Sequence, residues 1–346
     1  PDRPPHPEVE PVGEVVVASR SLRAVFFGTP EFAVPSLEAL LASRHAVVGA
    51  VTQPDRPRGR GQRVSDSPVK RVAAAAGVPV LQPERLKDPA FLEHLRGLQA
   101  DVGVVAAYGK ILPAAVLDLP PLGLVNVHAS LLPRYRGAAP VHRAVMAGDA
   151  ETGVSIMRVV EELDAGPVFS AAAIPIGPDE TSEELERSLA GLGARLLLGV
   201  IEALASTGAV ATPQDESAAT CAARLRKEEG VIDWTAGAGR IHDQVRGLHP
   251  WPLAWTWLRG KRVIVIRTRR VQDAPSSTLS PGHVVSMAGD ALRVQCGSGQ
   301  LDILLVRPEG RRAMAARDFA SGYAVTPGSR FDTPSPPGSS GLDGGC

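Results

Sequence analysis

The sequence predicts an α/β protein with a doubly wound, mostly parallel, Rossmann-like sheet, followed by a small C-terminal β-barrel of the OB-like kind. In the first half of the chain, short Val- and Ala-rich strands alternate with helix-length segments. This rhythm is typical of a parallel sheet that helices cover on both faces. In the last third, short strands separated by frequent turns follow one another, as in small barrels. The chain has 346 residues, a length that fits two domains.

The elements of the predicted sheet come in a regular order. Ser67 and Asp88 each precede a proline, a pattern that begins a helix. Thr181 and Ser182 are expected to cap a long helix that reaches Ala205. A further helix is expected at 35–43. The predicted strands are 23–27, 46–52, 77–83, 101–107 and 123–128, with a hairpin of 153–160 and 167–176 at the sheet edge.

Composition divides the chain further. The Pro-rich residues 1–22 and the Pro-, Gly- and Ser-rich residues 326–346 predict a disordered lead and a disordered tail. Between them we expect a catalytic domain at 23–207, a linker at 208–220 and a β-barrel domain at 221–325. The barrel is predicted from a helix at 238–248 and strands at 254–258, 262–268, 282–287, 291–295 and 301–307.

Charge is distributed unevenly along a chain whose formal net charge is zero. Residues 221–320 contain sixteen Lys or Arg and nine Asp or Glu, a balance of +7, so the remainder carries −7. This asymmetry indicates a polyanion partner for the C-terminal part. The three cysteines show no metal-ligand spacing, and no apolar run approaches the roughly 18 residues that span a bilayer. We therefore expect no metal and no membrane partner.

The segment from Asn126 to Gly137, NVHASLLPRYRG, is the most informative motif. Asn126 and His128 are two apart at the end of a predicted buried strand, so their side chains share one face at the carboxyl end of a parallel sheet, where ligands bind. A fixed amide or imidazole donor there can stabilise the oxyanion that forms when a nucleophile attacks a carbonyl carbon. A group that titrates near neutrality can also take up the proton of that nucleophile. Taken alone, each residue is more often structural.

Asp164, in the segment EELDAG, is the third candidate. A carboxylate near His128 would orient the imidazole and favour its charged form. By itself, an Asp-Ala-Gly sequence usually marks a turn.

Together these motifs resemble the family of folate-dependent formyltransferases. The resemblance implies that Asn126, His128 and Asp164 form the catalytic group and that Ser130, Leu131, Leu132 and Pro133 line a folate pocket. It also implies 10-formyltetrahydrofolate as the formyl donor and co-substrate. A GxGxxG phosphate-binding motif is missing after the first strand, where Gly28-Thr-Pro-Glu-Phe stands instead, so a nicotinamide cofactor is not expected.

An arginine-rich loop helps to choose among the activities of this family. Arg56, Arg58, Arg60 and Arg63 stand among glycines and prolines. Composition alone fits a solvated flexible loop, but such a loop can also order on RNA and contact its phosphates. The loop resembles the tRNA-binding loop of the family members that formylate methionyl initiator tRNA for translation initiation. Residues 227–234, 249–253 and 311–318 resemble the C-terminal domain of the same enzymes.

Three other functions stay open at this point. They are a hydrolase that deformylates 10-formyltetrahydrofolate, a transformylase that acts on a small amine, and a non-catalytic RNA-binding protein. The first two give no use to the basic loop and basic barrel, and the third leaves Asn126, His128 and Asp164 unexplained. We expect a monomer, in the cytoplasm of a bacterium or in the mitochondrial matrix or plastid of a eukaryote.

Overall fold

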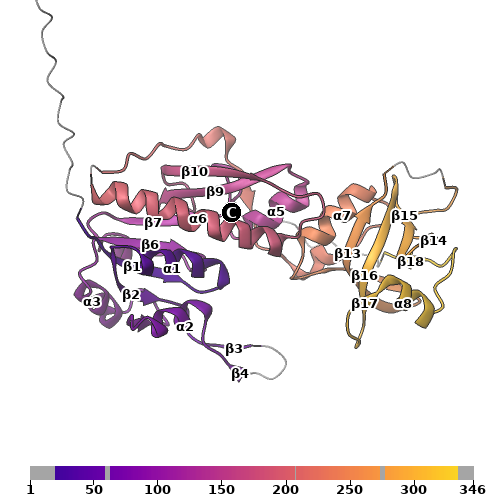
Figure 1. The fold of residues 1–346 in the computed structure, drawn as a ribbon, viewed down its shortest axis with the longest axis horizontal. Helices are drawn as coiled ribbons and strands as arrows, with labels where there is room; N and C mark the ends of the chain where they lie inside the picture. The colour runs from indigo at the N-terminus through magenta and orange to yellow at the C-terminus, as the bar shows by residue number, and fades with distance from the viewer. Residues whose placement is uncertain (1–19, 59–62, 207, 273–276, 334–346) are drawn as a thin grey trace, which may run out of the picture.

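A computed structural model describes residues 20–58, 63–206, 208–272 and 277–333. Two lobes lie side by side, an N-terminal lobe of residues 20–206 and a C-terminal lobe of residues 221–333 (Figure 1). Arg60, most of the expected lead and most of the expected tail lie outside the described residues.

The N-terminal lobe contains a seven-stranded sheet in the order β10-β9-β7-β6-β1-β2-β5. The strands in the middle of this order run parallel, and the hairpin of β9 and β10 adds antiparallel strands at one edge. The predicted doubly wound, mostly parallel sheet is therefore confirmed. The strands are β1 (Arg23–Gly28), β2 (Ala46–Val51), β5 (Val80–Leu81), β6 (Val102–Ala106), β7 (Leu124–His128), β9 (Glu151–Arg158) and β10 (Val168–Pro175).

Helices bury both faces of this sheet. One apolar core contains residues of α1 (Val34–Ala42), α2 (Pro68–Ala75) and α6 (Ser182–Ala205), and a second contains residues of α3 (Pro89–Gly97) and α4 (Ala114–Leu117). The predicted caps are present, since the side chains of Ser67 and Asp88 accept hydrogen bonds from Lys70 N and Ala90 N. Short 3-10 turns occur at η1 (Glu31–Ala33), η2 (Glu216–Ala218) and η3 (Lys227–Gly230).

The helix α6 differs from its prediction in two respects. Thr181 caps its start as predicted and forms a capping box with Glu184, but Ser182 is already the first helical residue and its hydroxyl donates to the Gly247 carbonyl oxygen instead. However, its length and composition are those of a helix that could cross a membrane, so the expectation that no segment reaches that length is wrong. Its apolar residues Leu185, Leu189 and Leu197 are fully buried in the core under the sheet. In this fold α6 is therefore a core helix.

The C-terminal lobe is a curled antiparallel sheet in the order β14-β15-β16-β13-β12-β18. A bridge between His283 and Arg330 joins its first strand to its last and closes the barrel. Trp234, Phe319 and Phe331 fill the interior. The elements are α7 (Ala238–Gly247), β12 (Ala254–Leu258), β13 (Lys261–Arg270), β14 (Val284–Ala288), β15 (Ala291–Gln295), β16 (Gln300–Pro308), β17 (Met314–Ala315), α8 (Ala316–Gly322) and β18 (Phe331–Asp332).

Both segments expected to be disordered include described residues with fixed contacts. Leu22 is fully buried and its backbone N–H donates to His45 Nδ1. At the other end, β18 lies within the segment expected to be a tail, and Phe331 is buried in the barrel and pairs with Leu258. Burial of this ring favours order in a segment whose composition is rich in Pro and Gly. For the rest of both segments, disorder stays a prediction.

The two lobes meet along a seam between α5 (Pro140–Ala147) and α7. A Cβ on Gly247 would lie 2.4 Å from Met146 Cγ, so this glycine lets the helices approach closely. The buried Arg246 guanidinium donates to the carbonyl oxygens of Gly177 and Glu180, at 3.2 and 3.1 Å. A buried guanidinium with fixed carbonyl acceptors holds the lobes in one orientation.

His142 lies at this seam and makes stability depend on pH. Burial, and next the charge of Arg143, lower the pKa of His142 from 6.5 to about 4. Because the unfolded chain takes up the proton first, stability is lost as pH falls from about 6.5 towards about 4. Glu186 lies next to His142, with its Oε1 3.7 Å from His142 Nδ1, and burial raises its pKa from 4.5 to about 6. Because the unfolded chain loses this proton first, Glu186 lowers the stability as pH rises from about 4.5 to about 6, which opposes the effect of His142.

We predict that His142→Gln becomes more stable relative to the unmodified protein as pH is lowered from neutrality to about pH 5, because it removes the cost of burying a group that protonates. The free energy of unfolding from urea titrations at several pH values measures this difference. His94→Gln, at an exposed histidine of α3, is the control. A difference that stays constant with pH would show that the pKa of His142 is the same in the folded and unfolded chain.

Candidate active site

The candidate site lies at the carboxyl end of β7, where the structure brings Asn126, His128 and Asp164 to one edge of the sheet. Asn126 and His128 come from β7 itself, and Asp164 comes from the turn between β9 and β10. Because β9 runs antiparallel to β7 and ends beside Val125, the turn has to fold back along β7 before Asp164 reaches His128. The arrangement agrees with the shared face expected from the two-residue spacing.

The ring of His128 is held on both sides. Its Nε2 lies 2.9 Å from the carbonyl oxygen of Tyr135. A carbonyl oxygen only accepts hydrogen bonds, so Nε2 carries the proton in this contact. The other ring nitrogen, Nδ1, faces Asp164 Oδ2 at 3.6 Å. With 5 % of its surface exposed, His128 presents little besides these two nitrogens.

Asp164 is fixed by its backbone and by a donor from the neighbouring loop. Its φ is +51°, in the left-handed region, which Asp tolerates better than most residues. Its Oδ2 accepts a hydrogen bond from Gly137 N at 2.8 Å. Gly137 has a φ of +121°, and a Cβ there would lie 2.9 Å from the Ala222 carbonyl oxygen. The position of the carboxylate thus depends on a glycine.

Asn126 differs from its neighbours because its amide has no fixed partner. The side chain is half-buried, between Val105 of β6 and Met157 of β9 in the sheet. No residue in the described part of the chain hydrogen-bonds to its amide. A half-buried amide on the same strand as the buried His128 imidazole leaves a donor for a ligand oxygen.

The Ser130–Pro133 segment forms a tight turn after β7. Ser130 is fully buried, and its hydroxyl donates to the Arg134 carbonyl oxygen at 2.6 Å, so this side chain shapes the turn from inside. Leu131, Leu132 and Pro133 are half-buried and form the outer side of the turn. They are the part of the predicted folate-binding segment whose side chains can face a ligand.

Ser155 of β9 supports this turn and was not predicted from the sequence. Its fully buried hydroxyl donates to the Ser130 carbonyl oxygen at 2.8 Å and accepts from Leu132 N at 3.1 Å. Ser155 pairs with His128 in the sheet register. A single serine within an apolar strand is the only signal that the sequence offers.

The segment that joins the lobes also contributes to the site. Thr220 Oγ1 accepts from Tyr135 N at 2.8 Å, and Thr220 N donates to the Pro133 carbonyl oxygen at 3.2 Å. Directly after it, β11 (Cys221–Ala222) pairs with β8 (Arg136–Gly137). The loop after β7 therefore has its far side fixed by the chain that leads to the C-terminal lobe.

The arginine-rich loop rises on a short ribbon of β3 (Pro57–Arg58) and β4 (Arg63–Val64), which projects from the N-terminal lobe (Figure 1). Arg56 at its base is exposed. The backbones of Arg58 and Arg63 belong to this ribbon, but their side chains and all of Arg60 lie outside the described residues. Asp55 forms an ion pair with Lys70 and thereby anchors the base of the ribbon to α2.

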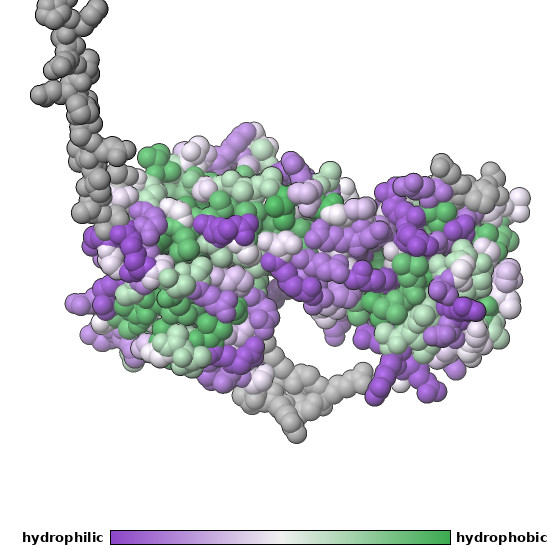
Figure 2. Space-filling view, viewed as in Figure 1, coloured by the Kyte–Doolittle hydropathy of each residue, from purple (hydrophilic) through white to green (hydrophobic). Residues whose placement is uncertain are grey.

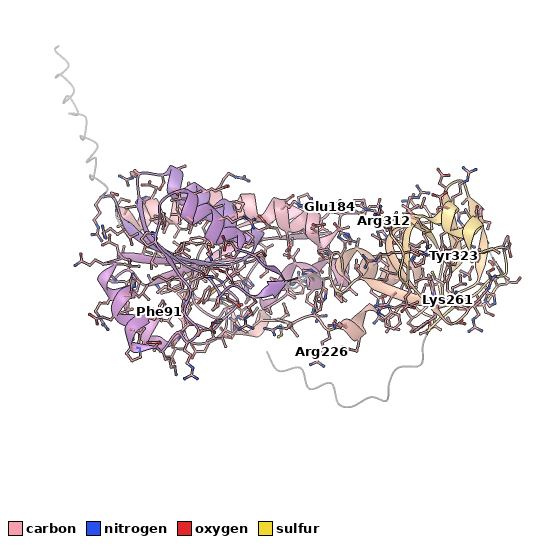
Figure 3. The ribbon with its side chains drawn as sticks, turned by 90° about the horizontal axis from the view of Figure 1, so that it is seen from below. Phe91, Glu184, Arg226, Lys261, Arg312 and Tyr323 are labelled. Carbon is pink, nitrogen blue, oxygen red and sulfur yellow. The ribbon has the colours of Figure 1, made fainter. Side chains whose placement is uncertain are left out.

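Cations are also exposed on the C-terminal lobe. The surface is hollowed between the lobes, and hydrophilic side chains border the hollow (Figure 2). Arg226, Lys261 and Arg312, labelled in Figure 3, are exposed and form no ion pair with any carboxylate in the described ranges. These unpaired cations agree with the polyanion partner expected from the charge balance.

Comparisons with known proteins show that the chain is similar to formyl transferases over most of its length. The family model described as formyl transferase matches residues 22–201, and the model of the formyl transferase C-terminal domain matches residues 224–324. The methionyl-tRNA formyltransferase of Moorella thermoacetica is 48 % identical over 89 % of this chain and 98 % of its own length. That of Methylococcus capsulatus is 47 % identical over 90 % of this chain and 100 % of its own length.

Solved structures with low sequence identity share the fold. An N-formyltransferase from Helicobacter canadensis, in complex with folinic acid and dTDP-3-aminofucose, has a TM-score of 0.63 at 15 % identity and covers 82 % of this chain and 99 % of that chain. HypX from Aquifex aeolicus in complex with tetrahydrofolic acid has a TM-score of 0.62 at 15 % identity and covers 88 % of this chain and 48 % of that longer chain.

Proposed function

This chain belongs to the formyl transferase family, and from that premise we propose that it transfers the formyl group of 10-formyltetrahydrofolate to the free amino group of methionyl initiator tRNA. The observation that carries the proposal is the 48 % identity with a methionyl-tRNA formyltransferase over nearly the whole length of both chains. This likeness includes the C-terminal domain, whose basic surface would have no role if the formyl acceptor were water or a small amine. The product is N-formylmethionyl-tRNA for translation initiation.

We assign the chemistry to Asn126, His128 and Asp164. The amine nitrogen attacks the formyl carbon, the formyl oxygen gains negative charge, and the bond from that carbon to the folate nitrogen then breaks. Asn126 donates to the formyl oxygen, because its amide is half-exposed and without a partner among the described residues. His128 receives the surplus amine proton at Nδ1, since Nε2 already carries a proton towards Tyr135, and this proton is then delivered to the folate nitrogen as its bond to the formyl carbon breaks. Asp164 Oδ2, at 3.6 Å, stabilises the positive charge on the ring by Coulomb attraction.

We place the enzyme in the compartment where its tRNA substrate is used. For a bacterial source this is the cytoplasm, and for a eukaryotic source it is the mitochondrial matrix or plastid. We further propose that it acts as a monomer without a membrane partner, because the site is built entirely from one chain.

The direct test is a transfer assay with 10-formyltetrahydrofolate and Met-charged initiator tRNA, scored as formylmethionyl-tRNA. Free methionine, water and an amino-sugar nucleotide serve as competing acceptors. Formylation of the charged tRNA well above the other three supports the proposal. Preferential formylation of the sugar or release of formate to water would contradict it.

We predict that Asn126→Ala and His128→Ala each lower kcat by about a hundred-fold or more, the usual effect of removing an oxyanion donor or a proton acceptor. Circular dichroism and the affinity for tRNA should stay near native, because the loop that His128 contacts through Tyr135 is also held by Ser130 and Thr220. Near-native turnover in purified His128→Ala would remove His128 from the mechanism.

We predict that Ser155→Ala weakens the affinity for folate ligands, because the Ser130–Pro133 turn loses two hydrogen bonds to its backbone, one at the Ser130 carbonyl oxygen and one at Leu132 N. Fluorescence titration with 5-formyltetrahydrofolate measures the affinity. Ser170→Ala, in the same hairpin but outside the turn, is the matched control. Equal affinities in the two variants would mean that the turn holds its shape without Ser155.

We predict that replacing Arg56, Arg58, Arg60 and Arg63 by alanine raises KM for tRNA and leaves folate affinity unchanged. The salt dependence of tRNA binding should also fall, by up to about one unit of slope for each phosphate that the loop no longer binds. If the guanidinium groups make forked contacts, Arg60→Lys weakens tRNA binding about as much as Arg60→Ala does, because an ammonium cannot make the same two contacts. Arg71→Ala, which breaks an exposed ion pair with Glu31 on the same lobe, is the control. Unchanged tRNA kinetics in the fourfold variant would leave RNA recognition to the C-terminal lobe.

A further inference from the structure

One residue of the segment between the lobes, Gln214, reaches into the turn that contains Asp164. Its Nε2 donates to the carbonyl oxygens of Asp164 and Gly166, at 2.8 and 2.6 Å. Its Oε1 accepts from Arg136 Nε and Nη2, at 3.0 and 2.8 Å. A single half-buried amide thus joins the Asp164 turn to the loop after β7.

The chemistry of these partners allows only one orientation of the amide. Carbonyl oxygens only accept hydrogen bonds, so the NH₂ group has to face Asp164 and Gly166. A guanidinium only donates, so the amide oxygen has to face Arg136. The donor and acceptor sides of Gln214 are therefore both required, and neither a carboxylate nor an apolar side chain supplies both.

The Asp164 turn depends on contacts from outside itself. Asp164 has a positive φ, and Glu161, Glu162 and Leu163 before it are exposed. After it, a Cβ on Gly166 would lie 1.9 Å from the Arg158 carbonyl oxygen, so the chain is tightly confined there. A turn with an exposed first half and a strained residue keeps its geometry only where its surroundings fix it.

The same amide also connects the two halves of the candidate site. Arg136 lies between Tyr135, whose carbonyl oxygen binds His128, and Gly137, whose N–H binds the Asp164 carboxylate. Gln214 holds Arg136 from one side and the Asp164 backbone from the other. The 3.6 Å separation of His128 Nδ1 and Asp164 Oδ2 is set by these two segments.

We propose that Gln214 is a positioning residue for Asp164, so that the segment leading to the C-terminal lobe completes the active site. The inference rests on the proposed function only through the role given to Asp164. Displacing a reacting group by about 1 Å costs up to about a hundred-fold in rate, so losing this support lowers turnover without removing any group that touches a substrate.

A neighbouring residue provides a matched control. Glu216 pairs with the same guanidinium, at 2.7 Å from Arg136 Nη2, but it makes no contact with the Asp164 turn in the described part of the chain. Glu216→Gln therefore perturbs Arg136 alone. Gln214→Glu does the reverse, because a carboxylate keeps Arg136 but repels the two carbonyl oxygens.

The experiment compares the steady-state kinetics of Gln214→Glu, Glu216→Gln, Asp164→Asn and the double variant Gln214→Glu/Asp164→Asn. We expect Gln214→Glu to lower kcat by roughly ten- to a hundred-fold, with KM for both substrates within about two-fold, and Glu216→Gln to match the unmodified enzyme. If Gln214 acts through Asp164, the double variant is hardly slower than Asp164→Asn.

Two results would overturn this inference: native kcat in Gln214→Glu, or rate reductions that multiply in the double variant. Failure of the proposed catalytic role looks different, since Asp164→Asn would then keep native turnover by itself. If Gln214→Glu does not fold, Gln214→Met, which keeps the chain length without a charge, takes its place in the same comparison. Retained kcat in a folded Gln214→Met would equally contradict the proposal.

Discussion

The hydrogen bond between His128 Nε2 and the Tyr135 carbonyl oxygen is the contact around which the site is arranged. It forms only if the chain turns back within seven residues of the end of β7, and the buried hydroxyl of Ser130 stabilises that turn. Tyr135 has a φ of +61°, so this conformation needs support from outside the loop, which Thr220 supplies through Tyr135 N. Because Nε2 is occupied, Nδ1 is the nitrogen that faces Asp164. Under the proposed mechanism Nδ1 therefore accepts the proton, Asp164 stabilises the charged ring and Asn126 donates to the formyl oxygen.

The segment between the lobes therefore does more than connect them. It pairs with the loop after β7, forms a bridge from Thr212 to Val168 of β10 and reaches the Asp164 turn. Buried polar groups at the seam, such as Arg246, fix the C-terminal lobe against the start of α6. The exposed cations Arg226, Lys261 and Arg312 of the C-terminal lobe are thus held in a set orientation relative to the candidate site. A large polyanionic substrate needs this constancy, because its reactive end has to reach the sheet while its phosphates are bound elsewhere.

Features that depend on residues close together in the chain can be predicted from the sequence, whereas contacts between residues far apart in the chain cannot. Strand β7 and the helix caps at Ser67, Asp88 and Thr181 follow from periodicity and from residues within one turn of each other. The roles of Ser155, Gln214 and Thr220 arise from hydrogen-bond partners that are 25, 50 and 85 residues away in the chain. No local sequence pattern around a single serine, glutamine or threonine indicates such a partner. Likewise β18 consists of two residues whose order comes from the burial of Phe331, within a segment of turn-forming composition.

The protonation state of His128 tests the account most directly, because every role assigned at the site depends on which ring nitrogen is free. Long-range ¹H–¹⁵N NMR of selectively labelled histidine distinguishes the two nitrogens, and His128→Gln assigns the signal. The account predicts a neutral ring with a protonated, hydrogen-bonded Nε2 and a bare Nδ1. A neutral ring with its proton on Nδ1 and a bare Nε2 would contradict it, since the Tyr135 carbonyl oxygen cannot donate.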